Sequence, residues 1–140
     1  DRSTLWNHIS ANIPEGRCNF IVHEGFITDT AGLIGLLQNS GARKAVWDLI
    51  DVDAQGAELE MFRGNLEWFS AHARRLHIST HSRAIHKEIL GTLRLLGWTV
   101  LMDFPCLSSP RVGALGKLVS MDGHMTVVPS QASEVWTPHF

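Results

Sequence analysis

The stretch AVWDLIDV, residues 45–52, decides the fold class. Apolar side chains fill almost all of it, without the alternation of a strand that has one face in water. A strand that is apolar on both faces is typical of a parallel sheet with helices on each side. The stretch therefore predicts the buried strand of an α/β domain.

Helices and strands are expected to alternate on both sides of this stretch. Upstream, residues 3–13 predict the tail of a helix, and residues 19–27 (NFIVHEGFI) have the β-branched and apolar content of a strand. Residues 30–39 predict a short helix or an irregular excursion. Downstream, apolar residues at helical spacing predict a helix over residues 58–69, and residues 75–80 (RLHIST) predict a short strand.

The strongest helical pattern covers residues 83–96, where Ile85, Ile89 and Leu93 share one face. Ser82 is placed to cap its first turn, and Gly97 is placed to end it. This helix connects the strand at residues 75–80 to the next element of the chain.

Two further segments complete the predicted sheet. Residues 98–104 (WTVLMDF) predict a strand that Pro105 ends, and residues 115–128 predict two short strands about an Asp122-Gly123 turn. The alternation predicts an α/β fold with a mostly parallel sheet, and the closing hairpin adds an antiparallel element at one edge.

The composition excludes several classes of protein. The chain has 140 residues, 44% of them hydrophobic, and a formal net charge of -2, so we expect a single domain that binds no nucleic acid. No apolar stretch approaches the roughly 20 residues that span a bilayer, so we expect no membrane contact. Two distant cysteines and no visible signal peptide favour a cytoplasmic location.

The first candidate site follows the strand at residues 45–52. Asp51, Asp53, Gln55 and Glu58 flank Gly56, whose freedom at positive φ permits a tight turn. Ligands of open α/β sheets bind beyond the carboxyl ends of the strands, where acidic residues can hold an ammonium group, a hydroxyl or a metal ion. The alternative is structural: Asp53 caps the next helix and Glu58 interacts with its dipole.

The second candidate site is residues 79–82 (STHS), again between a strand and a helix. Histidine titrates near neutrality, so His81 is a candidate general base for a substrate hydroxyl. In the alternative interpretation, Thr80 and Ser82 cap the helix and His81 is only solvated.

Four histidines raise the hypothesis of a shared metal ion. They are His72, His77, His81 and His86. Four residues of strand span roughly 13 Å, which is too far for two ligands of one ion at about 2.1 Å each. The spacing therefore predicts no metal site shared by these histidines.

Residues 53–60 (DAQGAELE), followed by Arg63-Gly64, resemble the D-x-(E/Q)-G-A-E-x-E…(K/R)-G signature of FkbM-type methyltransferases. Residues 77–82, with Ile85-His86 and Gly97-Trp98, resemble the next strand, helix and strand of that family.

The end of the chain carries a third match. Asp122-Gly123-His124 and Val128-Pro129 resemble the family's D-G-x-x-x-W-x-N-P ending, although Val127 and Val128 stand in its Trp and Asn region. The three matches occur in the family's order and cover residues 19–130.

The resemblance implies a Rossmann-like class I methyltransferase that uses S-adenosylmethionine to methylate a hydroxyl of a sugar, polyketide or other small molecule. It places Thr28 and Asp29 after the strand that approaches the adenine, and Asp51 near the methionine part of the cofactor. These three residues are therefore predicted to bind the cofactor.

The implied reaction is an in-line attack by the acceptor oxygen on the sulfonium methyl group, for which the protein supplies alignment and a proton acceptor. Asp53 or His81 would be that base, with Asp53 preferred because it ends the central strand. Gln55, Glu58 and Thr80 are expected to orient the acceptor.

No G-x-G motif precedes residue 19. The family's first two strands, which hold the cofactor, are therefore expected to be missing, leaving residues 1–140 as a single partial domain. The edge of residues 45–52 would then be open. We expect residues 19–27 to move beside it, or a second copy of the chain to pair there as a homodimer.

Two rival functions remain. An interaction module that keeps the sheet without catalysis would also lack the cofactor loop. A metal-dependent hydrolase that uses the histidines with Asp51 and Asp53 is disfavoured by the strand spacing.

Overall fold

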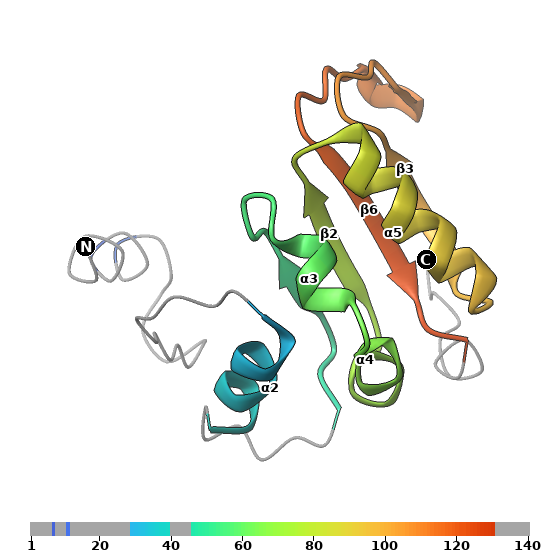
Figure 1. Cartoon of the computed structure of the whole chain (residues 1–140). Coiled ribbons are helices and arrows are strands. Elements are labelled where there is room, and N and C mark those ends of the chain that lie inside the picture. Colours follow the sequence, from blue (N-terminus) through green and yellow to red (C-terminus); the bar gives the residue numbers. More distant parts are fainter. Residues whose placement is uncertain (1–6, 8–10, 12–28, 40–45, 131–140) are drawn as a thin grey trace.

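A computed structural model describes Asn7, Ala11, residues 29–39 and residues 46–130 (Figure 1). The strand predicted at residues 19–27 and the cofactor contact predicted at Thr28 lie outside these residues. So does the helix predicted at residues 3–13, apart from Asn7 and Ala11, which are helical. The described elements are, in chain order, α2 (Thr30–Asn39), β1 (Ile50–Val52), α3 (Glu58–Phe62), α4 (Leu66–His72), β2 (Leu76–Thr80), α5 (Arg83–Leu95), β3 (Thr99–Phe104), β4 (Arg111–Val112), the 3₁₀ turn η1 (Gly113–Leu115), β5 (Gly116–Lys117) and β6 (Gly123–Val128).

The main sheet has the strand order β1-β2-β6-β3. Strands β1 and β2 are parallel, and β6 is antiparallel to both of its neighbours, β2 and β3. It follows that β3 runs in the same direction as β1 and β2. Helix α5 lies on one face of the sheet, runs roughly along the strands and contacts β2 and β6 (Figure 1). This mixed α/β sheet is compatible with a Rossmann-like fold.

The prediction of an antiparallel hairpin at one edge of the sheet was wrong, because β6 is an interior strand. Asp122-Gly123 does not join two paired strands, because β6 starts at Gly123 and inserts between β2 and β3. Strand β5 pairs instead with β4 in a separate two-stranded sheet. The physical reason lies in β6 itself: Met125, Val127 and Val128 are buried, which suits an interior strand.

Strand β1 is shorter than the predicted strand at residues 45–52. Its ladder covers Ile50–Val52, and Trp47 forms one isolated parallel bridge to Ala73. Ile50 and Val52 are buried, whereas Asp51 is exposed, so the prediction that both faces are buried was wrong for this residue. Among the described residues β2 is the one ladder partner of β1. Whether residues 19–27 or a second chain cover its other edge stays a prediction.

The predicted helix over residues 58–69 is two helices. Arg63 is extended and Gly64 has φ +76°, so α3 ends at Phe62 and α4 begins four positions later, at Leu66. The apolar stripe nonetheless stays together, because the rings of Phe62 and Phe69 pack with centroids 4.8 Å apart.

Two of the predicted helices are confirmed. Helix α2 has the predicted bounds, and Ser82 caps α5 by accepting the Ile85 N–H at 3.1 Å. Gly97 follows the end of α5 with φ +75°. Helix α5 contacts both α3 and β2, and these elements enclose a common core. No helix among the described residues is long and apolar enough to cross a membrane.

Candidate active site

The parallel pairing of β1 and β2 brings the two predicted site segments together. Val52 is opposite Ile78 in the register, so the residues that follow both strands emerge at the same edge of the sheet. The chain then turns at Gln55 and Gly56, which have φ 51° and 101°. Because of this turn α3 starts with Glu58 facing the end of β2.

Asp53, Glu58 and His81 meet at this edge and are called here the His81 cluster. The Nδ1 atom of His81 lies 2.6 Å from Oε1 of Glu58, and its Nε2 atom lies 3.3 Å from Oδ1 of Asp53. The ring therefore lies between two carboxylates. Asp53 and Glu58 come from the first predicted segment, and His81 comes from the second, 23 positions further along the chain than Glu58.

Glu58 is the buried member of the His81 cluster. Its side chain has no exposed surface, and its Oε1 atom also accepts the N–H of Gly56 at 2.9 Å. Its Oε2 atom is buried and has no hydrogen-bond partner among the described residues. Burying a carboxylate oxygen without a partner costs free energy, so such an atom needs an explanation.

Asp53 is the accessible member. More than half of its side chain, 56%, is exposed, against 19% for His81. Gln55 donates its Nε2–H to Oδ1 of Asp53 at 3.2 Å, across the turn. An incoming group can therefore reach the cluster from the side of Asp53, while Glu58 closes it from behind.

Asp51 and Asp29, the two described residues that were predicted to bind the cofactor, are not part of the His81 cluster. Asp51 is exposed on β1, opposite His77 in the register. Asp29 is exposed, and its Oδ1 accepts the N–H of Gly32 at 2.8 Å at the start of α2.

Thr80, predicted to contact the substrate, is fully buried in a second group of side chains. Its Oγ1 lies 2.9 Å from Nδ1 of His86, and Nε2 of His86 lies 2.9 Å from Oδ1 of Asp103. The thiol of Cys106 donates to the carbonyl oxygen of Thr80 at 3.3 Å. These four residues are called the His86 network, and the structure does not bring Thr80 into the His81 cluster.

The His86 network packs against the backbone of β6. A Cβ atom at Gly123 would lie 2.3 Å from Oγ1 of Thr80 and 2.5 Å from Nδ1 of His86. Glycine is therefore required here for close approach. Sequence analysis missed this network, because nothing in the spacing of Asp103 or Gly123 signals a contact with His86.

Four histidines were considered for a shared metal ion, and the two not yet described, His72 and His77, have hydrogen-bond partners of their own. His72 lies 2.8 Å from the carbonyl oxygen of Trp68 through Nδ1, and its ring stacks on the Trp68 indole. His77 lies 2.9 Å from the Thr126 hydroxyl. The four histidines thus occupy separate surroundings.

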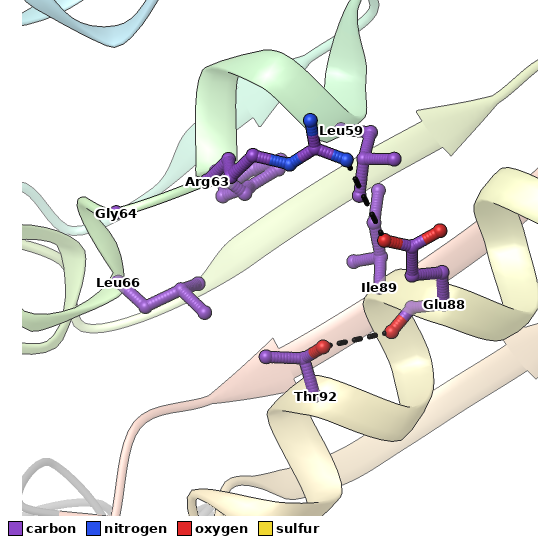
Figure 2. Close-up of a pocket in the computed structure, with 8 residues that line it drawn as sticks. Leu59, Arg63, Gly64, Leu66, Glu88, Ile89 and Thr92 are labelled. Atoms are coloured by element: carbon purple, nitrogen blue, oxygen red, sulfur yellow. Dashed lines mark hydrogen bonds and ion pairs between the residues drawn. The ribbon is translucent and has the colours of Figure 1, made fainter.

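A shallow pocket of about 150 Å³ lies between α3 and α5, on the helical side of the sheet (Figure 2). Leu59, Phe62 and Ile89 form its apolar lining, and an ion pair of Arg63 with Glu88 at 3.7 Å closes one side. No member of the His81 cluster lines it. Arg63 and Gly64, singled out in the sequence, therefore serve the break after α3 and this rim.

Comparison with known proteins adds one relative. The chain is 36% identical over 66 residues to a protein of Jannaschia sp. (strain CCS1) named "Putative methyltransferase". The match covers 47% of this chain and 24% of the relative, so the chain spans less than a quarter of the relative's length. No protein-family model and no solved structure matches the chain. The similarity supports a methyltransferase in general terms.

Proposed function

We propose that the chain is part of an S-adenosylmethionine-dependent O-methyltransferase of the FkbM type and that the His81 cluster activates the acceptor hydroxyl. The observation that carries the proposal is the 2.6 Å contact between His81 and the fully buried Glu58 at the carboxyl edge of β1 and β2. Methyl transfer agrees with the name of the relative, and the edge is where open α/β sheets bind ligands.

The geometry gives each member of the His81 cluster a role. With the proton on Nδ1, His81 donates to Glu58 and keeps the lone pair of Nε2 for a substrate proton. The buried carboxylate of Glu58 holds the ring in this tautomer and stabilises the positive charge that the ring gains. Asp53, beside Nε2 and more exposed, orients the acceptor hydroxyl, and Gln55 holds Asp53.

The reaction then balances within these groups. The acceptor oxygen forms a bond to the methyl carbon while the bond from that carbon to sulfur breaks, and Nε2 of His81 takes the hydroxyl proton. S-adenosylmethionine supplies the electrophilic methyl group. Among the residues predicted to hold it, Asp29 and Asp51 are exposed carboxylates, which fit the hydroxyl and ammonium groups of such a cofactor.

This assignment moves the preferred base from Asp53 to His81. The sequence favours Asp53 as the base because it follows a strand expected to be central, whereas β1, which Asp53 follows, is an outer strand of the described sheet. The Asp53 carboxylate also has no buried partner that would tune or orient it, whereas His81 has Glu58. We therefore expect Asp53 to assist and His81 to accept the proton.

The experiment measures transfer of a labelled methyl group from S-adenosylmethionine to a panel of sugar and polyketide alcohols, with the full-length protein. His81→Asn is the decisive variant, because the Asn amide can still donate to Glu58 but has no counterpart of Nε2. We expect turnover to fall about 100-fold or more, the scale of lost general-base catalysis.

Two controls test whether the effect is local. His77→Asn changes a histidine of β2 that contacts Thr126, and Glu60→Gln changes an exposed acid of α3; both should keep near-normal turnover. Wild-type turnover in His81→Asn would remove His81 as the base. No methyl transfer by the wild-type protein to any alcohol, with the cofactor bound, would favour the rival interaction module.

A further inference from the structure

The three side chains of the His81 cluster place atoms that can bind a metal ion close to one another. One ligand atom from each of Asp53, Glu58 and His81 lies within 4.8 Å of the other two. Two ligands of one ion at about 2.1 Å each are at most about 4.2 Å apart, so a shift of about half an ångström closes the widest gap. Asp53 can make this shift, since it is the most exposed of the three.

The contact between His81 and Asp53 already has the right span. Two ligand atoms about 2.1 Å from an ion and separated by 3.3 Å, as Nε2 and Oδ1 are, subtend about 105° at the ion. This angle is close to the tetrahedral value. The separation of the pair therefore suits two corners of a coordination sphere once the exposed Asp53 carboxylate turns toward the lone pair of Nε2.

Glu58 adds an independent observation. Its Oε2 atom is buried and has no hydrogen-bond partner among the described residues, although its other oxygen has two. Burying a carboxylate oxygen costs free energy unless a donor or a cation lies beside it. An ion between Glu58 and the other two side chains would supply what this atom lacks.

The protons of His81 lead to the same conclusion. A neutral imidazole carries one N–H, so it can donate to Glu58 or to Asp53 but not to both. With the proton on Nδ1 and donated to Glu58, two electron-rich atoms, Nε2 of His81 and Oδ1 of Asp53, lie 3.3 Å apart with no proton between them. A cation between these two atoms turns this repulsion into attraction.

We propose that Asp53, Glu58 and His81 bind one divalent cation of the zinc or manganese type. Two carboxylates and one imidazole form a mixed oxygen and nitrogen set, which such ions accept more readily than calcium or magnesium, whose ligands are oxygens. Three protein ligands leave at least one coordination position open. No metal site was predicted from the sequence because the spacing along a strand disfavours both an ion shared by the histidines and one shared by them with Asp51 and Asp53. The structure instead gathers one histidine with two acids, Asp53 and Glu58.

A coordination position left open on the exposed side of the cluster, beside Asp53, would take an acceptor hydroxyl. This part of the inference rests on the proposed methyl transfer. The ion would act as a Lewis acid on that hydroxyl and lower the cost of losing its proton, which would pass to solvent water at the exposed side, while His81 would hold the ion instead of accepting the proton.

The test is calorimetric titration of the full-length, tag-free protein, freed of metal with a chelator, with ZnCl₂ and separately with MnCl₂. We expect one saturable site per chain. Asp53→Asn and His81→Asn should each weaken binding about 100-fold or more. Asp53 is exposed, so this variant is expected to fold even if changes at the buried Glu58 do not.

His77→Asn is the matched control and should bind like the wild type, since His77 lies outside the cluster. No saturable binding of either ion by the wild type would overturn the inference, and so would unchanged binding by both Asp53→Asn and His81→Asn. The titration does not depend on turnover, so the two proposals can fail separately. Methyl transfer at full rate by the metal-free enzyme would overturn the role of the cation and leave the proposed function. Binding of the cation without methyl transfer would overturn the proposed function and leave the cation site.

Discussion

The two histidines five positions apart, His81 and His86, each lie between two oxygen-bearing partners, yet their surroundings differ. The side chain of His86 is 4% exposed, and both of its ring nitrogens have hydrogen-bond partners at 2.9 Å. The His81 cluster opens to solvent at Asp53 and contains a buried carboxylate oxygen without a partner among the described residues.

We infer from this difference that the His86 network is structural, whereas the His81 cluster is the site of the proposed function. In the His86 network the burial of polar atoms is compensated locally, so it needs no ligand to be stable. In the His81 cluster the compensation is incomplete, and the open side admits the group that can complete it. The presence of a histidine does not distinguish the two groups. What distinguishes them is whether each buried polar atom has a hydrogen-bond partner.

The largest expected effect is the difference in stability between a variant of His86 and a variant of His81. His86→Ala leaves the Thr80 hydroxyl and the Asp103 carboxylate without their shared partner, so we expect the free energy of unfolding to fall by about 3 kcal/mol. His81→Asn keeps a donor for Glu58, so we expect a loss below about 1 kcal/mol. Urea denaturation followed by circular dichroism measures both. Equal losses would show that the two groups are alike in stability.

A smaller effect should come from the glycine against which the His86 network packs. Gly123→Ala introduces a methyl group within 2.5 Å of two network atoms, and we expect a loss of about 2 kcal/mol from overpacking. Gly91→Ala is the matched control, because no atom lies within 4 Å of its added Cβ and it stands in α5. There we expect a gain of about 0.5–1 kcal/mol from helix propensity. A Gly123→Ala protein as stable as the wild type would contradict the tight packing.

The smallest effect concerns Ser82, which lies between the two histidines in sequence. Ser82→Ala removes the acceptor of the Ile85 N–H at the start of α5, and we expect a loss of about 1 kcal/mol. Ser82→Asp, which keeps an acceptor, should stay close to the wild type in thermal unfolding. If Ser82→Ala also lowered methyl transfer far more than stability, the cap would serve the position of His81 as well.

The local part of the structure could be predicted from the sequence. The bounds of α2 and the cap of α5 follow from residues that are neighbours in the chain, such as Ser82 and Ile85. Asp53, Glu58 and His81 were each singled out, because they follow strands in an alternating pattern. Their meeting depends on the register of β1 with β2, which periodicity does not give.

The errors share a cause. The position of β6 in the sheet depends on its pairing with β2 and β3, which are distant in sequence. An Asp-Gly pair indicates a turn but does not show which strands pair on either side of it. The burial of Thr80 and Glu58 also depends on distant segments: Thr80 is covered by α5 and by Cys106, and Glu58 by the turn before it and by His81. Polar residues at strand ends were therefore assumed to be accessible, although two of them are not.

The insertion of β6 between β2 and β3 has a consequence for the order of folding. His77 and Thr126, which face each other across this junction, are 49 positions apart, so the junction closes late and at a high entropic cost. Until β6 is in place, β2 and β3 have no strand between them, and both present unpaired backbone groups. A folding intermediate without β6 therefore has two open strand edges, which favour aggregation.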